Sequence, residues 1–139
     1  MTIMADPDEK LEKQRWLRFT PASRRAYQSL PDEVQKHFGF ALYLAELGKS
    51  HPDAKVLRGF GGASVVEVIV RHDGETYRAV YTLRLPGFVY LIHAFQKKSK
   101  QGSETPKRER DAIQRGLTAA EKDYEERLPN ERPAPEEPG

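Results

Sequence analysis

Basic side chains near apolar segments are the residues of this 139-residue chain best suited to chemistry on a charged ligand. Arg78 lies in a segment with strand-type alternation, and Lys97 and Lys98 follow an apolar segment. Arginine binds phosphate through two parallel hydrogen bonds and lysine binds it as a point charge, so these residue types indicate phosphate binding. His93, within the apolar segment, is a candidate general acid or base near neutral pH.

Each of these residues also has a purely structural interpretation. Arg78 is alternatively an exposed strand arginine that pairs with Glu67, and the lysine pair is alternatively a solvated loop that blunts a sheet edge. A lone histidine such as His93 on an apolar strand is more often a hydrogen-bonded core residue than a catalytic one. The other histidines lack the spacing of a metal site, so no metal ligand is predicted.

Four further cations are candidates for contacts with a nucleic-acid backbone: Lys55, Arg58, Lys100 and Lys107. The first two flank a glycine-rich stretch whose amides can approach phosphate, although a plain flexible connection accounts for the same glycines. Lys107 falls in the first turn of a predicted helix, where free amides attract anions, and an ordinary surface lysine is the alternative.

Charge is distributed unevenly along the chain, although the formal net charge is only +2. Residues 55–115 hold 12 Lys or Arg and 6 Asp or Glu, a net charge of +6, whereas the remainder holds 11 and 15, a net charge of −4. A basic central block indicates a polyanionic partner such as nucleic acid. An ordinary charged surface with a solubilising acidic tail explains the same distribution.

The composition argues against several classes of protein. The chain has no cysteine, which excludes disulfides and thiolate metal sites and agrees with a reducing cytoplasm. It has no run of 18 apolar residues, so no membrane span is predicted, and residues 1–13 are too polar for a signal peptide. We therefore expect a cytoplasmic protein without a cofactor.

Hydrophobic periodicity predicts one α+β domain in the order β-α-α-β-β-β-α, with a helical hairpin and a C-terminal helix on an antiparallel sheet. The predicted strands are 14–19, 65–71, 76–85 and 88–95, and the predicted helices are 21–30, 31–47 and 106–127. One face of the second helix should cover the sheet: Val34, Phe38, Ala41, Leu42 and Ala45. The folded domain is predicted to cover 14–128, with disordered ends at 1–13 and 129–139.

Four strings in this order and spacing carry a resemblance to a known family: LPDEV (30–34), AKVLRGFGG (54–62), TYRAVY (76–81) and LIHAFQKKSKQGSETPKRERDAIQRGL (91–117). The last string is the most specific, because a strand that ends in an aromatic is followed by a lysine pair and a Thr-Pro-Lys helix start. Together the strings resemble the RelE/HigB superfamily of type II toxin–antitoxin systems, in particular its phage-derived HigB-like branch. The resemblance covers about residues 14–125.

The resemblance implies a toxin that cleaves messenger RNA, usually in the ribosomal A site, without a metal. The ribose 2′-hydroxyl attacks the adjacent phosphate while basic side chains stabilise the extra charge. Arg78 matches a strand arginine that activates the scissile phosphate, and Lys97 and Lys98 fall where relatives bind phosphate or donate a proton. The resemblance also implies a cognate antitoxin, commonly with a helix-turn-helix domain.

The strand VVEVIV departs from the pattern of many active relatives. It carries Glu67 and Ile69 where lysine or arginine is expected, and although Glu67 occurs in the HigB-like branch, Ile69 predicts weakened catalysis. Tyr124 lies too far along its helix to replace a C-terminal tyrosine that some relatives use.

Two alternative functions are compatible with the sequence. A ParE-like toxin would share the fold, inhibit DNA gyrase and cut no RNA. A non-catalytic RNA- or protein-binding module would use its acidic tail to mimic nucleic acid or to occupy its own basic groove.

Overall fold

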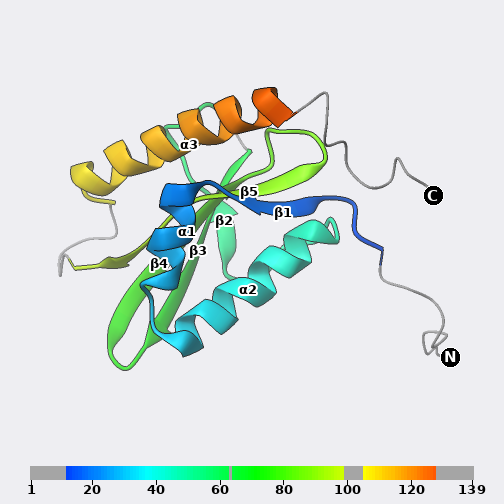
Figure 1. The fold of residues 1–139 in the computed structure, drawn as a ribbon. Helices are drawn as coiled ribbons and strands as arrows, with labels where there is room; N and C mark the ends of the chain where they lie inside the picture. The colour runs from blue at the N-terminus through cyan, green and yellow to red at the C-terminus, as the bar shows by residue number, and fades with distance from the viewer. Residues whose placement is uncertain (1–11, 63, 99–104, 128–139) are drawn as a thin grey trace, which may run out of the picture.

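The computed structural model describes residues 12–62, 64–98 and 105–127, arranged as a central sheet between helices (Figure 1). In chain order the elements are β1 (Trp16–Phe19), α1 (Pro21–Gln28), α2 (Asp32–Glu46), β2 (Ala54–Val56), β3 (Val65–His72), β4 (Glu75–Thr82), β5 (Phe88–Lys97) and α3 (Lys107–Arg127). The predicted α+β class and the order of the predicted elements are confirmed. Most of the two predicted disordered ends lies outside the described residues.

Local sequence signals mark the helix ends. At the start of α1 the Ser23 amide donates to Thr20 Oγ1 (3.2 Å) and the Thr20 amide donates to Ser23 Oγ (2.9 Å), which is a capping box. Two acidic residues lie in the first turn of α2, at the positive end of its dipole. Gly48 follows the end of α2 with a φ of +79°, a conformation that glycine adopts without strain.

Five strands form one sheet in the order β1-β5-β4-β3-β2. The three strands predicted to be antiparallel, β3, β4 and β5, form its centre. The β3–β4 hairpin turns through Asp73 (φ 52°) and Gly74 (φ 80°), and two successive positive φ values are typical of the turn that matches the twist of a hairpin.

Two features of the sheet were not predicted. β2 lies in a segment predicted as a loop, and it pairs antiparallel with β3, with Ala54 opposite Val68. Three residues are too short for a detectable alternation, so only the long-range pairing makes this segment a strand. β1 pairs in parallel with β5, so the expectation of a purely antiparallel sheet was wrong. Two helices separate β1 from the other strands, and such a crossover allows parallel pairing.

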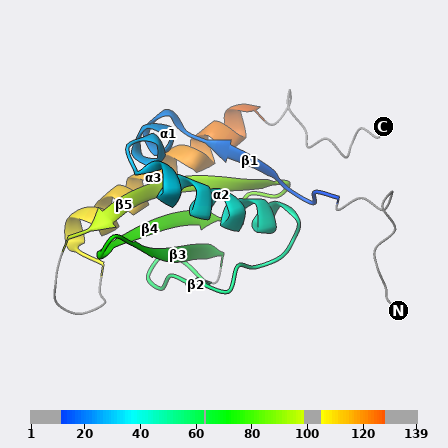
Figure 2. The same cartoon turned by 90° about the horizontal axis from the view of Figure 1, so that it is seen from below.

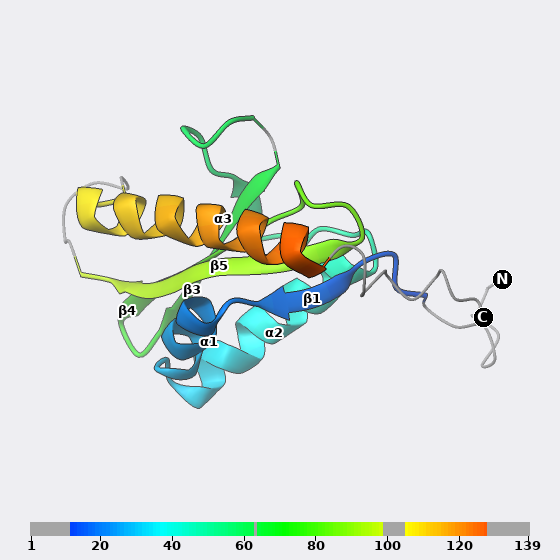
Figure 3. The same cartoon turned by 45° about the horizontal axis from the view of Figure 1, so that its top comes forward.

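α2 and α3 lie on opposite sides of the sheet (Figure 2), and each face of the sheet has its own core. On one face, all five residues of the predicted face of α2 are buried against apolar residues of β3, β4 and β5. On the other face, Ile113 and Leu117 of α3 pack with Val80 and Tyr90. α3 runs along β5 (Figure 3), so the outer strands β3 and β2 lie beside this helix and not under it.

Gly116 allows α3 to lie unusually close to β5. A Cβ atom at this position would collide with the backbone carbonyl of Ile92. Because the obstacle is backbone and not the end of a flexible side chain, the collision can be relieved only by moving the helix.

We predict that Gly116→Ala lowers the free energy of unfolding by about 1–3 kcal/mol through overpacking. In an exposed helix the same change would be stabilising by about 1 kcal/mol, so the sign of the effect reports the close approach. Urea denaturation measures it, with Gln114→Ala on the exposed side of α3 as a control expected to stay within about 0.5 kcal/mol of the unsubstituted chain. An alanine at 116 that stabilises the protein would contradict this packing.

Tyr90 links β5 to the C-terminal half of α3. Its hydroxyl donates to Asp123 Oδ2 (2.6 Å), and Asp123 also accepts from Arg127 Nε (2.9 Å). Burial, and then the hydrogen bond to Asp123, raise the pKa of Tyr90 above its ordinary value of 10.0.

A tyrosine with a raised pKa holds its proton more tightly in the folded state, so its contribution to stability is complete below pH 10.0 and is lost as the pH rises above it. We predict that Tyr90→Phe costs about 1–3 kcal/mol below that pH and makes the alkaline decline of stability shallower. Chemical denaturation between pH 8 and 11 tests this. If the free energy of unfolding falls equally steeply with pH in the two proteins, Tyr90 does not cause the alkaline loss of stability.

Candidate functional site

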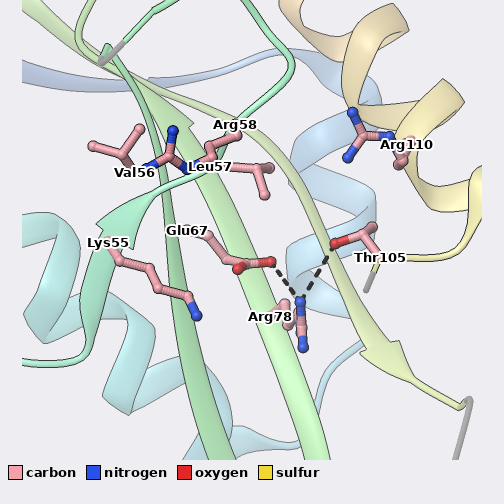
Figure 4. Close-up of a pocket in the computed structure, with 8 residues that line it drawn as sticks. All are labelled: Lys55, Val56, Leu57, Arg58, Glu67, Arg78, Thr105 and Arg110. Carbon is pink, nitrogen blue, oxygen red and sulfur yellow. Dashed lines mark hydrogen bonds and ion pairs between the residues drawn. The ribbon is translucent and has the colours of Figure 1, made fainter. Parts of the chain in front are cut away.

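An open cleft of about 760 Å³ lies on the α3 face of the sheet (Figure 4). Its lining comes from β2 and the residues after it, from β3 and β4, and from the chain entering α3: Lys55, Val56, Leu57, Arg58, Glu67, Arg78, Thr105 and Arg110. The structure therefore brings together three of the candidates predicted from sequence, which are Lys55, Arg58 and Arg78.

A buried ion pair forms the floor of the cleft. Arg78 Nη1 donates to Glu67 Oε2 at 3.0 Å, and the two residues are only 5% and 1% exposed. They lie on neighbouring strands and are offset in register, with Glu67 opposite Val80 and Arg78 opposite Ile69. The alternative interpretation of Arg78 as an exposed arginine paired with Glu67 is therefore right about the pairing and wrong about the exposure, because the chain leading into α3 covers this part of the sheet.

Arg78 also contacts the chain that leads into α3. Its Nη1 group lies 3.4 Å from Thr105 Oγ1, two residues before the helix begins. The contact connects the floor of the cleft to the start of the helix that forms one of its walls.

Two exposed cations, Lys55 and Arg58, and the half-buried Arg110 form the walls of the cleft. Lys55 lies opposite Glu67 in the β2–β3 pair and so projects from the same face of the sheet. Arg58 follows β2 and is exposed, and Arg110 enters from α3 (Figure 4). Among the described lining residues, four cations and the single carboxylate of Glu67 leave a net charge of +3.

The glycine-rich segment after β2 is tied to the rest of the fold. Arg84 donates to the Phe60 carbonyl through Nη2 and to Glu121 Oε2 on α3 through Nη1 (3.0 Å). Phe60 is buried in the core on this face. This segment is thus held as a wall of the cleft, in contrast to the plain flexible connection that the sequence favoured.

Ile69, the residue that departs from the family pattern, lies at the border of the cleft. It is opposite Arg78 on the same face of the sheet. It lines an adjoining hollow of about 460 Å³ that shares Lys55 with the cleft. An apolar side chain therefore occupies a place where a cation would have increased the positive charge near Arg78.

The lysine pair lies in a different hollow. Lys97 and Lys98 line a depression of about 290 Å³ together with Pro106, Arg108 and Glu109. Lys97 is 8% exposed and Lys98 is exposed. The structure does not bring these two lysines into the cleft of Arg78, and their catalytic role stays a prediction.

His93 is a hydrogen-bonded, half-buried residue. Its Nε2 atom lies 2.8 Å from Glu109 Oε1, and its ring stacks on Phe95 with 5.2 Å between centroids. It lines a hollow of about 470 Å³ beside α1 and lines no part of the Arg78 cleft. The structural interpretation of this histidine is confirmed by its contacts, and its catalytic role stays a prediction.

The remaining candidates lie apart from the cleft or outside the described residues. Lys107 has an exposed side chain and pairs with Asp111 one turn later (3.0 Å), as an ordinary surface lysine does. Lys100 lies outside the described residues.

Sequence reasoning did not select two lining residues, Thr105 as a contact of Arg78 and Arg110 as a cation. In the sequence, Thr105 is noted only as the first residue of the Thr-Pro-Lys helix start. A signal for Arg110 was present, because it precedes the buried residues Ile113 and Leu117 by three and seven positions and so lies on the same side of α3.

Within the part of the chain that the structure describes, no group of three or more His, Cys, Asp or Glu side chains is arranged to hold a metal ion. The described helices also include none that is long and apolar enough to cross a membrane.

The fold and the cleft define an α+β domain with a basic depression on one face of a mixed sheet. A family model described as "Phage derived protein Gp49-like (DUF891)" matches residues 26–118. The chain belongs to this family, which is a RelE/HigB-type toxin family. The resemblance that the four sequence strings carry is thereby confirmed, and the chain is by family a RelE-type toxin of toxin–antitoxin systems.

Two solved structures are similar to this chain. The isolated E. coli RelE toxin matches with a TM-score of 0.48 and 20% identity, over 73% of this chain and 97% of that toxin. A mutant of E. coli RelE in the free state matches with a TM-score of 0.48 and 18% identity, over 63% of this chain and 87% of the mutant. No curated protein sequence matches the chain.

We predict that breaking the buried pair from either side is strongly destabilising. Glu67→Leu removes the carboxylate that Arg78 pairs with in the buried floor and should lower the free energy of unfolding by about 3–5 kcal/mol. The double variant with Arg78→Met removes both charges and should recover most of that loss. Urea denaturation of the four proteins of this double-mutant cycle gives the coupling energy.

The exposed pair Lys107–Asp111 is the matched control, and Lys107→Ala should cost less than about 1 kcal/mol. Additive effects of the Glu67 and Arg78 substitutions would contradict direct coupling across the floor of the cleft.

Proposed function

We propose that this chain is the toxin of a type II toxin–antitoxin system and cleaves messenger RNA as a metal-independent endoribonuclease. The observation that carries the proposal is the cleft, in which Lys55, Arg58, Arg78 and Arg110 converge around one carboxylate on an open face of the fold. A concave surface of one sign of charge concentrates a polyanion. Membership of a RelE/HigB-type toxin family supports RNA as that polyanion.

The proposed reaction needs no metal ion. The 2′-hydroxyl of a ribose loses its proton and attacks the adjacent phosphorus, and the bond to the 5′-oxygen of the next nucleotide breaks. That oxygen takes up a proton, which leaves a 2′,3′-cyclic phosphate and a 5′-hydroxyl. The protein must hold the attacking and leaving oxygens in line and stabilise the extra negative charge on the phosphate.

The exposed cations of the cleft are suited to the second task. Arg58 presents a fork of donors that matches two phosphate oxygens, and Lys55 provides an ammonium that can also donate a proton to the leaving oxygen. Arg78 contributes positive charge from the floor, where Glu67 and Thr105 fix its orientation. A charge fixed before the substrate arrives needs little reorganisation during the reaction.

The other predicted residues are assigned to the surroundings of the scissile phosphate. Lys97, Lys98 and His93 line hollows near the start of α3, and Lys107 is exposed on its first turn. We propose that they contact the RNA strand beyond the cleft, together with Lys100. The ribosome is proposed to hold the message in the extended form that such a surface can follow.

A cognate antitoxin, of helix-turn-helix type, is the proposed protein partner. RelE-type toxins pair with antitoxins, and the family membership supports this part of the proposal. Both partners and the message would meet in the cytoplasm.

Primer extension on a defined message, with and without programmed ribosomes, tests the proposed activity. We expect new ends that need ribosomes and that persist in EDTA. Lys55→Ala and Arg58→Ala should each reduce cleavage about 10- to 100-fold, because one charge-assisted hydrogen bond contributes about 1.5–3 kcal/mol. Both residues are exposed, so their loss should leave the fold intact, unlike a change at Arg78.

Lys36→Ala is the matched control, because Lys36 is an exposed lysine of α2 on the opposite face of the sheet. If folded protein leaves the message intact both with and without ribosomes, the proposal is contradicted and a gyrase-inhibiting or non-catalytic role is favoured. If Lys55→Ala and Arg58→Ala cleave the message as fast as the unsubstituted chain, the cleft is not the active site.

A further inference from the structure

We infer that Arg110 is a phosphate-binding residue of the cleft, and that Gly59 and Phe60 are positioning residues that hold its guanidinium at the entrance. The nature of the ligand, an RNA backbone phosphate, rests on the proposed function. The placement of Arg110 rests on two contacts of its side chain, on the contacts that fix the segment it touches, and on the direction from which it enters the cleft (Figure 4).

The first contact is with an aromatic ring. The guanidinium carbon of Arg110 lies over Phe60, 4.8 Å from the ring centroid. A guanidinium attracted to the face of a ring keeps donors at its edge directed away from the ring. The contact therefore restrains the long side chain and leaves donors that can bind phosphate oxygens.

The second contact is with the backbone at Gly59. A Cβ atom there would collide with the Nη2 atom of Arg110. Gly59 also has a φ of +96°, a conformation that side-chain-bearing residues rarely adopt. The backbone of this segment thus passes directly against the guanidinium. The positive φ is what favours glycine here, because the end of a flexible arginine could move away from a Cβ atom.

The third set of contacts fixes the segment that holds Arg110. Arg84 donates to the Phe60 carbonyl and, through Nε, to Ser64 Oγ (3.3 Å), and it pairs with Glu121 on α3. The segment around Phe60 is therefore joined to α3 through Arg84, and α3 also carries Arg110. A side chain held in this way loses little conformational entropy when a ligand binds.

The charge around Arg110 also favours an anionic ligand. No carboxylate in the described part of the chain forms an ion pair with it, and the other described cations of the lining are Lys55, Arg58 and Arg78. Arg78 lies on the floor and Arg110 on the helix wall, so the two can contact different phosphates of one strand. Arg110 is accordingly assigned to a phosphate next to the scissile one.

Salt-dependent binding of a non-cleavable RNA tests this assignment without relying on cleavage. The probe is a fluorescent single-stranded oligonucleotide with 2′-O-methyl riboses, followed by anisotropy between 50 and 300 mM salt. Loss of one phosphate contact should reduce the slope of log affinity against log salt by about 0.7 for a single strand. Arg110→Ala should show this smaller slope and bind about 10-fold more weakly at low salt.

Two comparisons separate binding from positioning. Arg115→Ala is the matched control, because Arg115 is an exposed arginine of the same helix outside the cleft lining, and it should keep the original slope. Phe60→Leu removes the ring face and should weaken binding while the charge of Arg110 remains, whereas Phe60→Tyr keeps the ring face and should restore affinity. Thermal denaturation of each variant distinguishes these effects from unfolding.

The outcomes separate this inference from the proposed function. Arg110→Ala with unchanged slope and affinity overturns the role of Arg110, even if the protein cleaves messenger RNA. A chain that binds the probe through Arg110 but cleaves no message supports the inference and contradicts the nuclease. Failure of the unsubstituted chain to bind the probe overturns the inference, and the cleavage assay then decides the function independently.

Discussion

The buried ion pair between Glu67 and Arg78 is the interaction on which the arrangement of the cleft depends. Taking two charges out of water is costly, and the cost is recovered only when the geometry is good and further hydrogen bonds are made. Here the pair joins β3 to β4 at 3.0 Å, and Arg78 reaches on to Thr105. One guanidinium thereby fixes the position of the helix start relative to the sheet, and it places a positive charge at the bottom of the cleft.

The open space above this pair follows from where α3 lies. The close approach at Gly116 and the hydrogen bond between Tyr90 and Asp123 hold the helix along β5. The glycine-rich segment after β2 is held by Arg84, which joins it to the C-terminal half of α3. Between these two walls lies the cleft, whose floor is the buried pair on β3 and β4 and whose lining cations outnumber its one carboxylate.

Most of the secondary structure could be predicted from the sequence because its signals are local. The helical spacing from Val34 to Ala45 and the turn at Asp73 and Gly74 each depend on residues that are close together in the chain. β2 and the parallel pairing of β1 with β5 were missed because both depend on partners that are distant in sequence. No pattern within AKV distinguishes a strand of three residues from a loop.

The site could be predicted only in part, for the same reason. Residue type selected Arg78, Lys55 and Arg58 as candidates, and the structure places these three in one cleft. The other catalytic candidates, Lys97, Lys98 and His93, line neighbouring hollows. The chain entering α3 separates the lysine pair from the cleft, and this separation depends on how the helix returns over the sheet. The register shift of β5 opposite Val80 and Tyr81 further changes which side chains share a face, and no spacing rule shows it in advance.

The central claim is that the cleft around Glu67 and Arg78 receives the scissile part of the nucleic-acid backbone, and that the neighbouring hollows contact only the strand beyond it. The most direct measurement is a titration of the ¹⁵N-labelled chain with the non-cleavable RNA, followed by amide chemical shifts. The account predicts that the largest shifts fall at 55–58, in the middle of β3 and β4, and at 105–110. Shifts centred instead on His93, Lys98 and the end of α1, with the cleft unchanged, would contradict it.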